Sequence, residues 1–271
     1  FDIFGGTTFY QYAADPIVAL TISSLIILGG LGFAVMNDIW RQRSWQKLAP
    51  QSRIVLVTSA AMLAAGTVLL FLLERSNTET IGELSIGGQL LASWFESAIS
   101  RTAGFGIFDN GLLTESSLLI LILLMFIGAS PASTGGGIKT STFAIIVASI
   151  WSLIRGQEDV ELFSRRVPTE VILRSLAIFF LAASVTFFAA AYLCMTEGIP
   201  VIKAGFEVVS AFATVGLSTG ITPSLSADGK LLLVIIMLMG RVGVVTFAMA
   251  FAMKTKKKKV CRQPEGKFII G

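Results

Sequence analysis

The sequence predicts an all-α polytopic membrane protein assembled from repeated units. Hydrophobic residues make up 54% of the 271 residues and charged residues only 14%, whereas roughly 25% charged residues is usual for soluble domains. Uncharged segments long enough to cross a bilayer recur along the chain, since a spanning helix needs about 20 apolar residues. Two shorter apolar runs lie between them, and each is followed by a Thr-x-Gly sequence. These observations favour a bundle of membrane helices with re-entrant elements.

Five segments are expected to enter the membrane as spans. They are runs of 20 to 37 residues that contain at most one charged residue each. The segments are Ile17–Met36, Ile54–Leu73, Leu118–Ile154, Ser175–Thr196 and Leu231–Met253. The two shorter runs, Ile86–Phe95 and Ala204–Ala213, cannot span, so we expect buried or re-entrant helices there.

Basic residues gather in the connections 41–53 and 155–174 and in the stretch after Met253, which together hold 15 of the 21 Lys and Arg residues. By the positive-inside rule these regions are cytoplasmic, which makes the chain a multi-pass protein of the cell membrane with a cytoplasmic C-terminus. The run Lys256–Lys259 is expected to face anionic membrane lipid, and nucleic-acid binding has no support. The opposite loops carry 11 acids against four bases. Such loops would attract cations, although solvated loop charge is an equal explanation.

The run Leu118–Ile154 must be broken. It leads from the outer to the cytoplasmic side, and a straight helix of this length would measure about 55 Å against a hydrocarbon core of about 30 Å. Pro131 and three successive glycines disfavour helix within it. Irregular backbone at this depth is tolerated where it lines a cavity or is buried in protein. We expect a gating loop that includes Gly128, Ala129, Ser130, Ser133, Thr134, Gly135, Gly136, Gly137 and Lys139.

Alternatives to a gate exist for this stretch. A purely structural kink is one. A phosphate-binding loop is another, because Lys139-Thr140 follows the glycines, but Ile138 interrupts that motif and no soluble strand precedes it.

The two Thr-x-Gly sequences are expected to form an ion-selectivity filter. Main-chain carbonyls in such loops replace the hydration shell of a cation, and glycine allows the backbone angles that this requires. The predicted filter residues are Thr102, Ala103, Gly104, Phe105, Thr214, Val215, Gly216 and Leu217. Ordinary external turns are the alternative, but turns do not explain the uncharged run before each loop. Glu96 and Glu207, on the preceding short helices, are expected either to concentrate cations or to satisfy backbone donors.

Arg241 interrupts the last span. A charge at the bilayer centre is expensive and usually faces a cavity or a partner. In a cation pathway it would act as a barrier or pair with the Gly-rich loop. A structural ion pair with an acid is the alternative.

The chain is not expected to be an enzyme. It contains no His, and its two Cys, Cys194 and Cys261, can build neither a disulfide framework nor a metal site. The order of span, re-entrant helix, filter-like loop and span occurs twice. Residues Phe1–Phe4 also resemble Phe105–Phe108, so we expect the chain to begin inside an earlier copy, with its natural beginning missing.

These features together resemble the membrane subunit of the Trk/Ktr/HKT superfamily of potassium transporters, most closely its Ktr type. The matching pieces are Arg101–Phe105, Ser210–Leu217, the Gly-rich break with Lys139-Thr140, Gly240–Gly243 and Pro264–Lys267. The resemblance implies four M1-P-M2 units, each a span, a pore helix and a span, around a pseudo-fourfold pore. The units map as residues 1–53 (end of the second unit and a cytoplasmic loop), 54–170 (third unit, with the broken helix), 171–253 (fourth unit) and 254–271 (basic cytoplasmic tail). On this mapping the first unit and most of the second are expected to be missing from this sequence.

The same resemblance implies uptake of K⁺ through the filter, passively or linked to Na⁺, with one filter glycine per unit and Arg241 near the gating loop. It also implies a homodimer on a cytosolic ring of nucleotide-binding RCK subunits, and no organic cofactor in this chain. The main rival is a secondary transporter whose substrate site lies at the broken helix. A non-conducting scaffold is a further rival.

Overall fold

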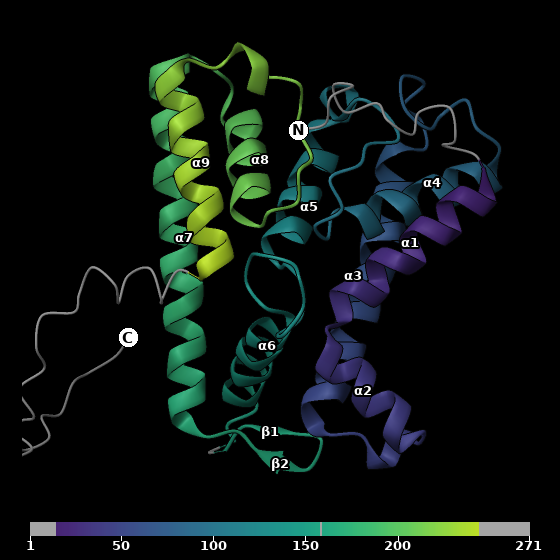
Figure 1. Ribbon diagram of the computed structural model, residues 1–271, viewed down its shortest axis with the longest axis vertical. Coiled ribbons are helices and arrows are strands. Elements are labelled where there is room, and N and C mark those ends of the chain that lie inside the picture. The colour runs from purple at the N-terminus through teal and green to yellow at the C-terminus, as the bar shows by residue number, and fades with distance from the viewer. Residues whose placement is uncertain (1–14, 158, 244–271) are drawn as a thin grey trace, which may run out of the picture.

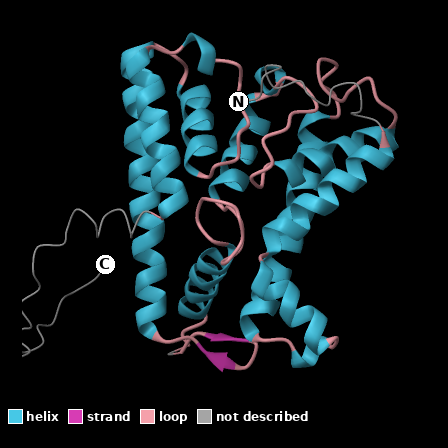
Figure 2. Cartoon of the chain, viewed as in Figure 1, coloured by secondary structure: helices cyan, strands magenta, loops and turns pink. Residues whose placement is uncertain are grey.

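The computed structural model describes residues 15–157 and 159–243, and its regular structure is almost entirely helical (Figures 1 and 2). The α-helices are α1 (Pro16–Leu31), α2 (Phe33–Gln42), α3 (Pro50–Glu74), α4 (Ile86–Ile99), α5 (Glu115–Phe126), α6 (Thr140–Ile154), α7 (Thr169–Glu197), α8 (Val201–Phe212) and α9 (Ala227–Val242). The short 3₁₀ turns are η2 (Trp45–Lys47), η3 (Asn110–Leu112) and η4 (Thr222–Ser224). The strands β1 (Glu161–Leu162) and β2 (Arg165–Arg166) form a small antiparallel hairpin.

Several of these helices are suited to a bilayer. Helices α3 and α7 are each long and apolar enough to cross a membrane, and α1 with α2 qualifies as a bent pair. Helices α5 and α6 are shorter apolar helices that together replace the long run. The expectation of an all-α membrane protein is therefore confirmed at the level of its spanning helices.

The run Ile17–Met36 does not form one continuous helix. The helix stops at Gly32, and α1 and α2 meet at 94°. Gly32 has a φ of 83°, in the region that favours glycine, and a Cβ atom there would lie 2.7 Å from the carbonyl oxygen of Pro131. Glycine at this position thus permits both the bend and the close approach of the Gly-rich loop.

The break in the long apolar run lies where the sequence predicts it. Helix α5 ends at Phe126 and α6 begins at Thr140, and the intervening loop is the teal turn between them in Figure 1. Ile127 and Ile138 form a parallel bridge, and the Ile138 amide donates to the Phe126 carbonyl at 3.2 Å. The two ends of the loop are therefore held together by hydrogen bonding.

Helices α4 and α8 are the two short helices expected to be re-entrant. Each descends from the upper end of the molecule in Figure 1 and stops partway down. Helix α4 packs against α1 and α3, and α8 packs against α5, α7 and α9. Their inward faces are fully buried, with Phe95 and Phe206 among the largest enclosed side chains. The loops that follow these helices, 102–105 after α4 and 214–217 after α8, therefore begin in the interior of the protein.

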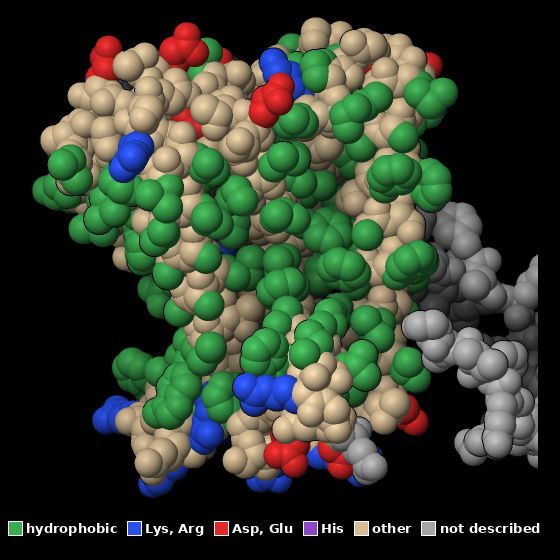
Figure 3. Space-filling model, turned by 180° about the vertical axis from the view of Figure 1, so that it is seen from behind, with side chains coloured by type: hydrophobic (Ala, Val, Ile, Leu, Met, Phe, Trp, Pro, Cys, Tyr) green, Lys and Arg blue, Asp and Glu red, His purple; other side chains and the backbone are tan. Residues whose placement is uncertain are grey.

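Charge is distributed unevenly along the long axis. The α2–α3 connection and the β1–β2 hairpin share the lower end in Figure 1, opposite the α7–α8 connection. Figure 3 shows Lys and Arg side chains gathered mainly at that lower end, a broad hydrophobic belt above it, and acidic side chains at both ends. The two basic connections thus lie on one side, as the topology prediction requires. Their cytoplasmic orientation stays a prediction.

We expect Gly240→Ala to lower the stability of the α8–α9 contact. A Cβ atom at Gly240 would lie 1.6 Å from the carbonyl oxygen of Phe212, so the helices would have to separate. Overpacking of this kind costs about 1–3 kcal/mol or more. The expected result is a lower melting temperature and a smaller monodisperse fraction in detergent. Gly205→Ala is the control, because its nearest neighbour, Ile122 Cδ1, would be 3.8 Å away. Equal melting temperatures for both variants would contradict this view of the contact.

Candidate functional site

The two Thr-x-Gly loops meet inside the protein. A Cβ atom on Gly216 would lie 2.8 Å from the Cα atom of Gly104, and one on Gly104 would lie 3.4 Å from the carbonyl oxygen of Val215. These distances leave no room for side chains between the two glycines. The structure therefore brings the predicted residues of both loops side by side, through glycines that are far apart in the sequence.

The two loops share an unusual backbone. In each, the threonine and the glycine have positive φ angles, with one residue between them. The values are 63° for Thr102, 75° for Gly104, 54° for Thr214 and 94° for Gly216. Positive φ is rare for a β-branched residue, and each such residue stores on the order of 1–3 kcal/mol. The sequence predicts such backbone angles only at the glycines, and the positive φ of the two threonines was not predicted.

The 214–217 loop is fixed to the end of α8. The Ser210 hydroxyl donates to the Leu217 carbonyl at 2.5 Å, and the Val215 amide donates to the Ser210 carbonyl at 2.9 Å. The side chains of Val215 and Leu217 are each only 2% exposed. The loop is therefore fixed by its hydrogen bonds to Ser210 and by the buried side chains of Val215 and Leu217.

Glu207 of α8 secures the segment that follows this loop. Its carboxylate is fully buried and accepts hydrogen bonds from donors on three later residues. The donors are Ser218 Oγ at 2.7 Å, the Thr219 amide at 2.8 Å, Thr219 Oγ1 at 3.1 Å and Thr222 Oγ1 at 2.8 Å. Of the two expectations for Glu207, the structure therefore supports satisfaction of donors.

The 102–105 loop is attached differently. Arg101 is only 8% exposed, and its guanidinium donates to the Ser59 carbonyl on α3 at 2.9 Å. The Ser97 hydroxyl of α4 donates to the Leu63 carbonyl on α3 at 3.0 Å. These bonds hold the end of α4, and with it the loop, against a spanning helix.

The Gly-rich loop lies against the threonines of both Thr-x-Gly loops. The Gly136 amide donates to Thr214 Oγ1 at 3.0 Å. A Cβ atom on Gly136 would lie 2.7 Å from Thr214 Oγ1, and one on Gly135 would lie 2.9 Å from Thr102 Oγ1. The glycines are needed because any side chain would separate the loop from the threonines.

The other half of this loop is bound to the surrounding helices. The Ser130 amide donates to the Gly30 carbonyl of α1 at 3.1 Å, and the Thr140 hydroxyl donates to Ser130 Oγ at 3.2 Å. The Ser133 hydroxyl donates to the Ser130 carbonyl at 2.6 Å, and Ala129 is 2% exposed. Residues 129–133 therefore form a fixed base from which the glycines extend.

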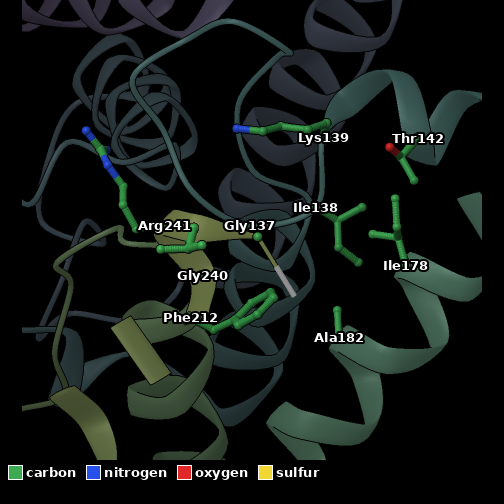
Figure 4. A pocket seen from close by; sticks show the side chains of 11 residues that line it. Gly137, Ile138, Lys139, Thr142, Ile178, Ala182, Phe212, Gly240 and Arg241 are labelled. Carbon is green, nitrogen blue, oxygen red and sulfur yellow. The ribbon is translucent and has the colours of Figure 1, made fainter. Parts of the chain in front are cut away.

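Two cationic side chains hold the middle of the loop. Lys139 Nζ donates to the Gly135 carbonyl at 2.6 Å, and the Arg241 guanidinium donates to the Thr134 carbonyl. Both residues line a cavity of about 210 Å³ together with Ile138 and Phe212 (Figure 4). In the described part of the chain, Arg241 thus binds a loop carbonyl, as expected for pairing with the loop.

Some predicted features cannot be placed. Residues Phe1–Phe4, the end of the last predicted span and the basic tail with Pro264–Lys267 lie outside the described residues. Among the described residues, no group of three or more acidic or cysteine side chains could hold a metal ion. The oxygen atoms that lie next to the glycines at the junction of the three loops include the carbonyl oxygen of Val215 and the hydroxyl oxygens of Thr102 and Thr214.

Comparison with known proteins identifies the family. A family model described as TrkH, cation transport protein, matches residues 1–262. The chain is 41% identical over 265 residues to the Ktr system potassium uptake protein B of Vibrio alginolyticus, covering 96% of this chain and 57% of that protein. It is 37% identical to the protein of the same name from Bacillus subtilis, covering 96% of this chain and 58% of the relative.

Two further similarities extend this result. The chain is 33% identical to the potassium/sodium uptake protein NtpJ of Enterococcus hirae, covering 100% of this chain and 61% of that protein. The crystal structure of the potassium transporter TrkH from Vibrio parahaemolyticus shares the fold, with a TM-score of 0.70 at 18% identity, over 89% of this chain and 52% of that chain. The chain spans less than two thirds of each of these proteins. It belongs to the TrkH family of cation transport proteins, a family of transporters and not of enzymes.

Proposed function

We propose that this chain forms part of a pore for potassium uptake across the cell membrane. The observation that carries the proposal is the meeting of two Thr-x-Gly loops with the same left-handed threonine and glycine. Alternation of left-handed and ordinary residues turns successive carbonyl groups toward one side of the strand. Carbonyl oxygens of Thr102–Phe105 and Thr214–Leu217 would then replace the hydration shell of K⁺. The names of the relatives from Vibrio alginolyticus and Bacillus subtilis support K⁺, and that of NtpJ adds Na⁺.

The complete pore would consist of four M1-P-M2 units around a pseudo-fourfold axis. In this arrangement α3, α4 and the broken α5–α6 form the third unit, and α7, α8 and α9 form the fourth. Residues 15–42 supply the end of the second unit. The similarity to the TrkH crystal structure supports the fold, and the greater length of the relatives leaves room for the remaining units.

The Gly-rich loop would act as the gate. The loop lies against Thr102 and Thr214, so at this end of the proposed filter it would obstruct an ion that leaves. Arg241 would hold the loop closed and would raise the barrier to cations. Opening then requires the loop to leave the two threonines.

We further propose that the intact transporter is a homodimer and works with a cytosolic ring of nucleotide-binding RCK subunits. The basic connections 41–53 and 155–174 and the basic tail 254–271 would face the cytoplasm and anionic lipid. The relatives named as protein B of a Ktr system support a multi-component assembly. Uptake of K⁺ would be passive or linked to Na⁺, and the transported ion is substrate rather than cofactor.

Ion flux in liposomes tests the pore. The intact transporter is reconstituted in liposomes that hold an outward K⁺ gradient. Uptake of Rb⁺, as a substitute for K⁺, is then measured and compared with uptake of Na⁺. A pore predicts net Rb⁺ uptake that follows the membrane potential and exceeds Na⁺ uptake. A secondary transporter with its substrate site at the broken helix predicts saturable exchange that requires an ion on the opposite side. That second result, or no flux of either ion, would contradict the proposal.

A further inference from the structure

The two pore helices carry the same buried dipeptide in different surroundings. Phe95-Glu96 lies in α4 and Phe206-Glu207 in α8, and the two glutamates are 1% and 0% exposed. Four donors surround the Glu207 carboxylate, as described above. Neither carboxyl oxygen of Glu96 has a hydrogen-bond partner among the described residues. Two glutamates in matching positions of the fold are therefore in opposite chemical situations.

Glu96 faces a small closed space. A cavity of about 10 Å³ is lined by Glu74, Ser93 and Glu96 together with apolar side chains, Leu70 and Phe108 among them. This volume is about that of one water-sized probe. The Ser93 hydroxyl donates to the Gln89 carbonyl at 2.8 Å, so its proton is not directed to Glu96. The cavity thus has room for one water molecule and no protein donor for the carboxyl group.

The other carboxyl group at this cavity is saturated with donors. Glu74, at the end of α3, is 2% exposed. It accepts hydrogen bonds from Asn77 Nδ2 at 2.7 Å, Thr80 Oγ1 at 2.8 Å, the Thr114 amide at 2.9 Å and Thr114 Oγ1 at 2.8 Å. An acceptor with four donors is suited to carry negative charge. A second negative charge at the same cavity would be repelled.

No described cation compensates a charge on Glu96. Helix α1, which packs on α4, contains no charged residue over Pro16–Leu31. On α3 the charged residues are Arg53, whose guanidinium donates to the Gln46 carbonyl, and Glu74. Arg101 follows α4 but donates to the Ser59 carbonyl, and Glu115 of α5 is exposed. Glu96 also lies in the last turn of α4, where the helix dipole disfavours an anion.

We propose that Glu96 is a proton-binding site in the last turn of α4, the helix that leads to the 102–105 loop. A carboxylate buried without a partner is so costly that the group takes up a proton instead. The neutral carboxyl group can donate that proton to one water molecule in the cavity. Ionisation would place an unpaired charge between α3 and α4 and disturb the attachment of the 102–105 loop. Selectivity is therefore expected to depend on the proton at Glu96.

Infrared spectroscopy of the intact transporter tests the site directly. At neutral pH an exposed glutamate, with an ordinary pKa of about 4.3, is ionised and gives carboxylate bands. The wild-type minus E96Q difference spectrum is expected to contain the C=O band of a carboxylic acid. The matched wild-type minus E207Q spectrum is expected to contain carboxylate bands. Carboxylate bands in the first difference would overturn the proposal and would indicate a bound cation instead.

Two further measurements keep the test decisive. If E96Q fails to fold, the wild-type spectrum at neutral pH must still contain a carboxylic-acid band, and its absence would overturn the proposal. If E96Q folds, its Rb⁺ over Na⁺ selectivity should match the wild type at neutral pH and should stay constant at alkaline pH, where that of the wild type falls. A loss of selectivity in E96Q at neutral pH would mean that the charge, not the proton, is needed. The spectra do not depend on transport, so they stand even if the pore proposal fails.

Discussion

Replacing Gly216 by alanine is expected to abolish the preference of the transporter for Rb⁺ over Na⁺. The φ of 94° at Gly216 is strained for any residue with a side chain, and the new Cβ atom would lie 2.8 Å from the Cα atom of Gly104. Backbone strain alone costs about 1–3 kcal/mol, which corresponds to about a 5- to 150-fold change in an equilibrium constant. The steric contact adds to this, because the opposing atom is main chain and cannot rotate away. The measurement is the ratio of Rb⁺ to Na⁺ uptake in liposomes.

Gly220→Ala separates backbone strain from steric contact. Gly220 follows the same loop and has a φ of 84°, but a Cβ atom there would meet nothing within 4 Å. We expect this variant to retain most of its selectivity and to lose only stability. If Gly216→Ala kept the wild-type ratio while remaining folded, the assignment of the 214–217 loop as a filter would be wrong. Equal losses in both variants would mean that strain, rather than contact between the loops, is responsible.

The features that could be predicted from the sequence are those that depend on the residue composition of a single segment. Long uncharged runs identify α3 and α7, and Pro131 with the three glycines identifies the break between α5 and α6. The Thr-x-Gly loops were recognisable because each follows an apolar run too short to span. In all these cases the structure of a segment is determined by the residues of that same segment.

The features that were missed depend on contacts between distant segments. The Gly-rich loop approaches the bend at Gly32. The three glycines of the run Ile17–Met36 were a weak signal of a break, but nothing in the run indicates which distant loop contacts it. Likewise Thr214 adopts a positive φ where it receives the Gly136 amide. Glu96 and Glu207 look alike in the sequence. Only the positions of donors from other segments distinguish them.

Arg241→Gln is expected to increase cation flux by about tenfold. The Arg241 guanidinium donates to the Thr134 carbonyl, and Lys139 Nζ donates to the neighbouring Gly135 carbonyl at 2.6 Å. A hydrogen bond from a charged donor contributes about 1.5–3 kcal/mol, and 1.4 kcal/mol corresponds to about a tenfold change in an equilibrium. Glutamine is too short to reach the carbonyl and removes the charge. The closed loop therefore loses an attachment, and the barrier to cations falls.

The direction of this effect distinguishes a gate from a structural tie, because a tie predicts lower flux with lower stability. Arg174→Gln on the exposed face of α7 is the matched control, and it should leave flux unchanged. Shortening the loop by Gly135 and Gly136 should raise flux further, since these residues contact Thr102 and Thr214. Selectivity should survive both changes, because neither alters the carbonyls of the proposed filter. Folded variants with wild-type flux would show that the loop does not obstruct the pathway, and the Arg241 bond would then serve only to join α9 to the α5–α6 break.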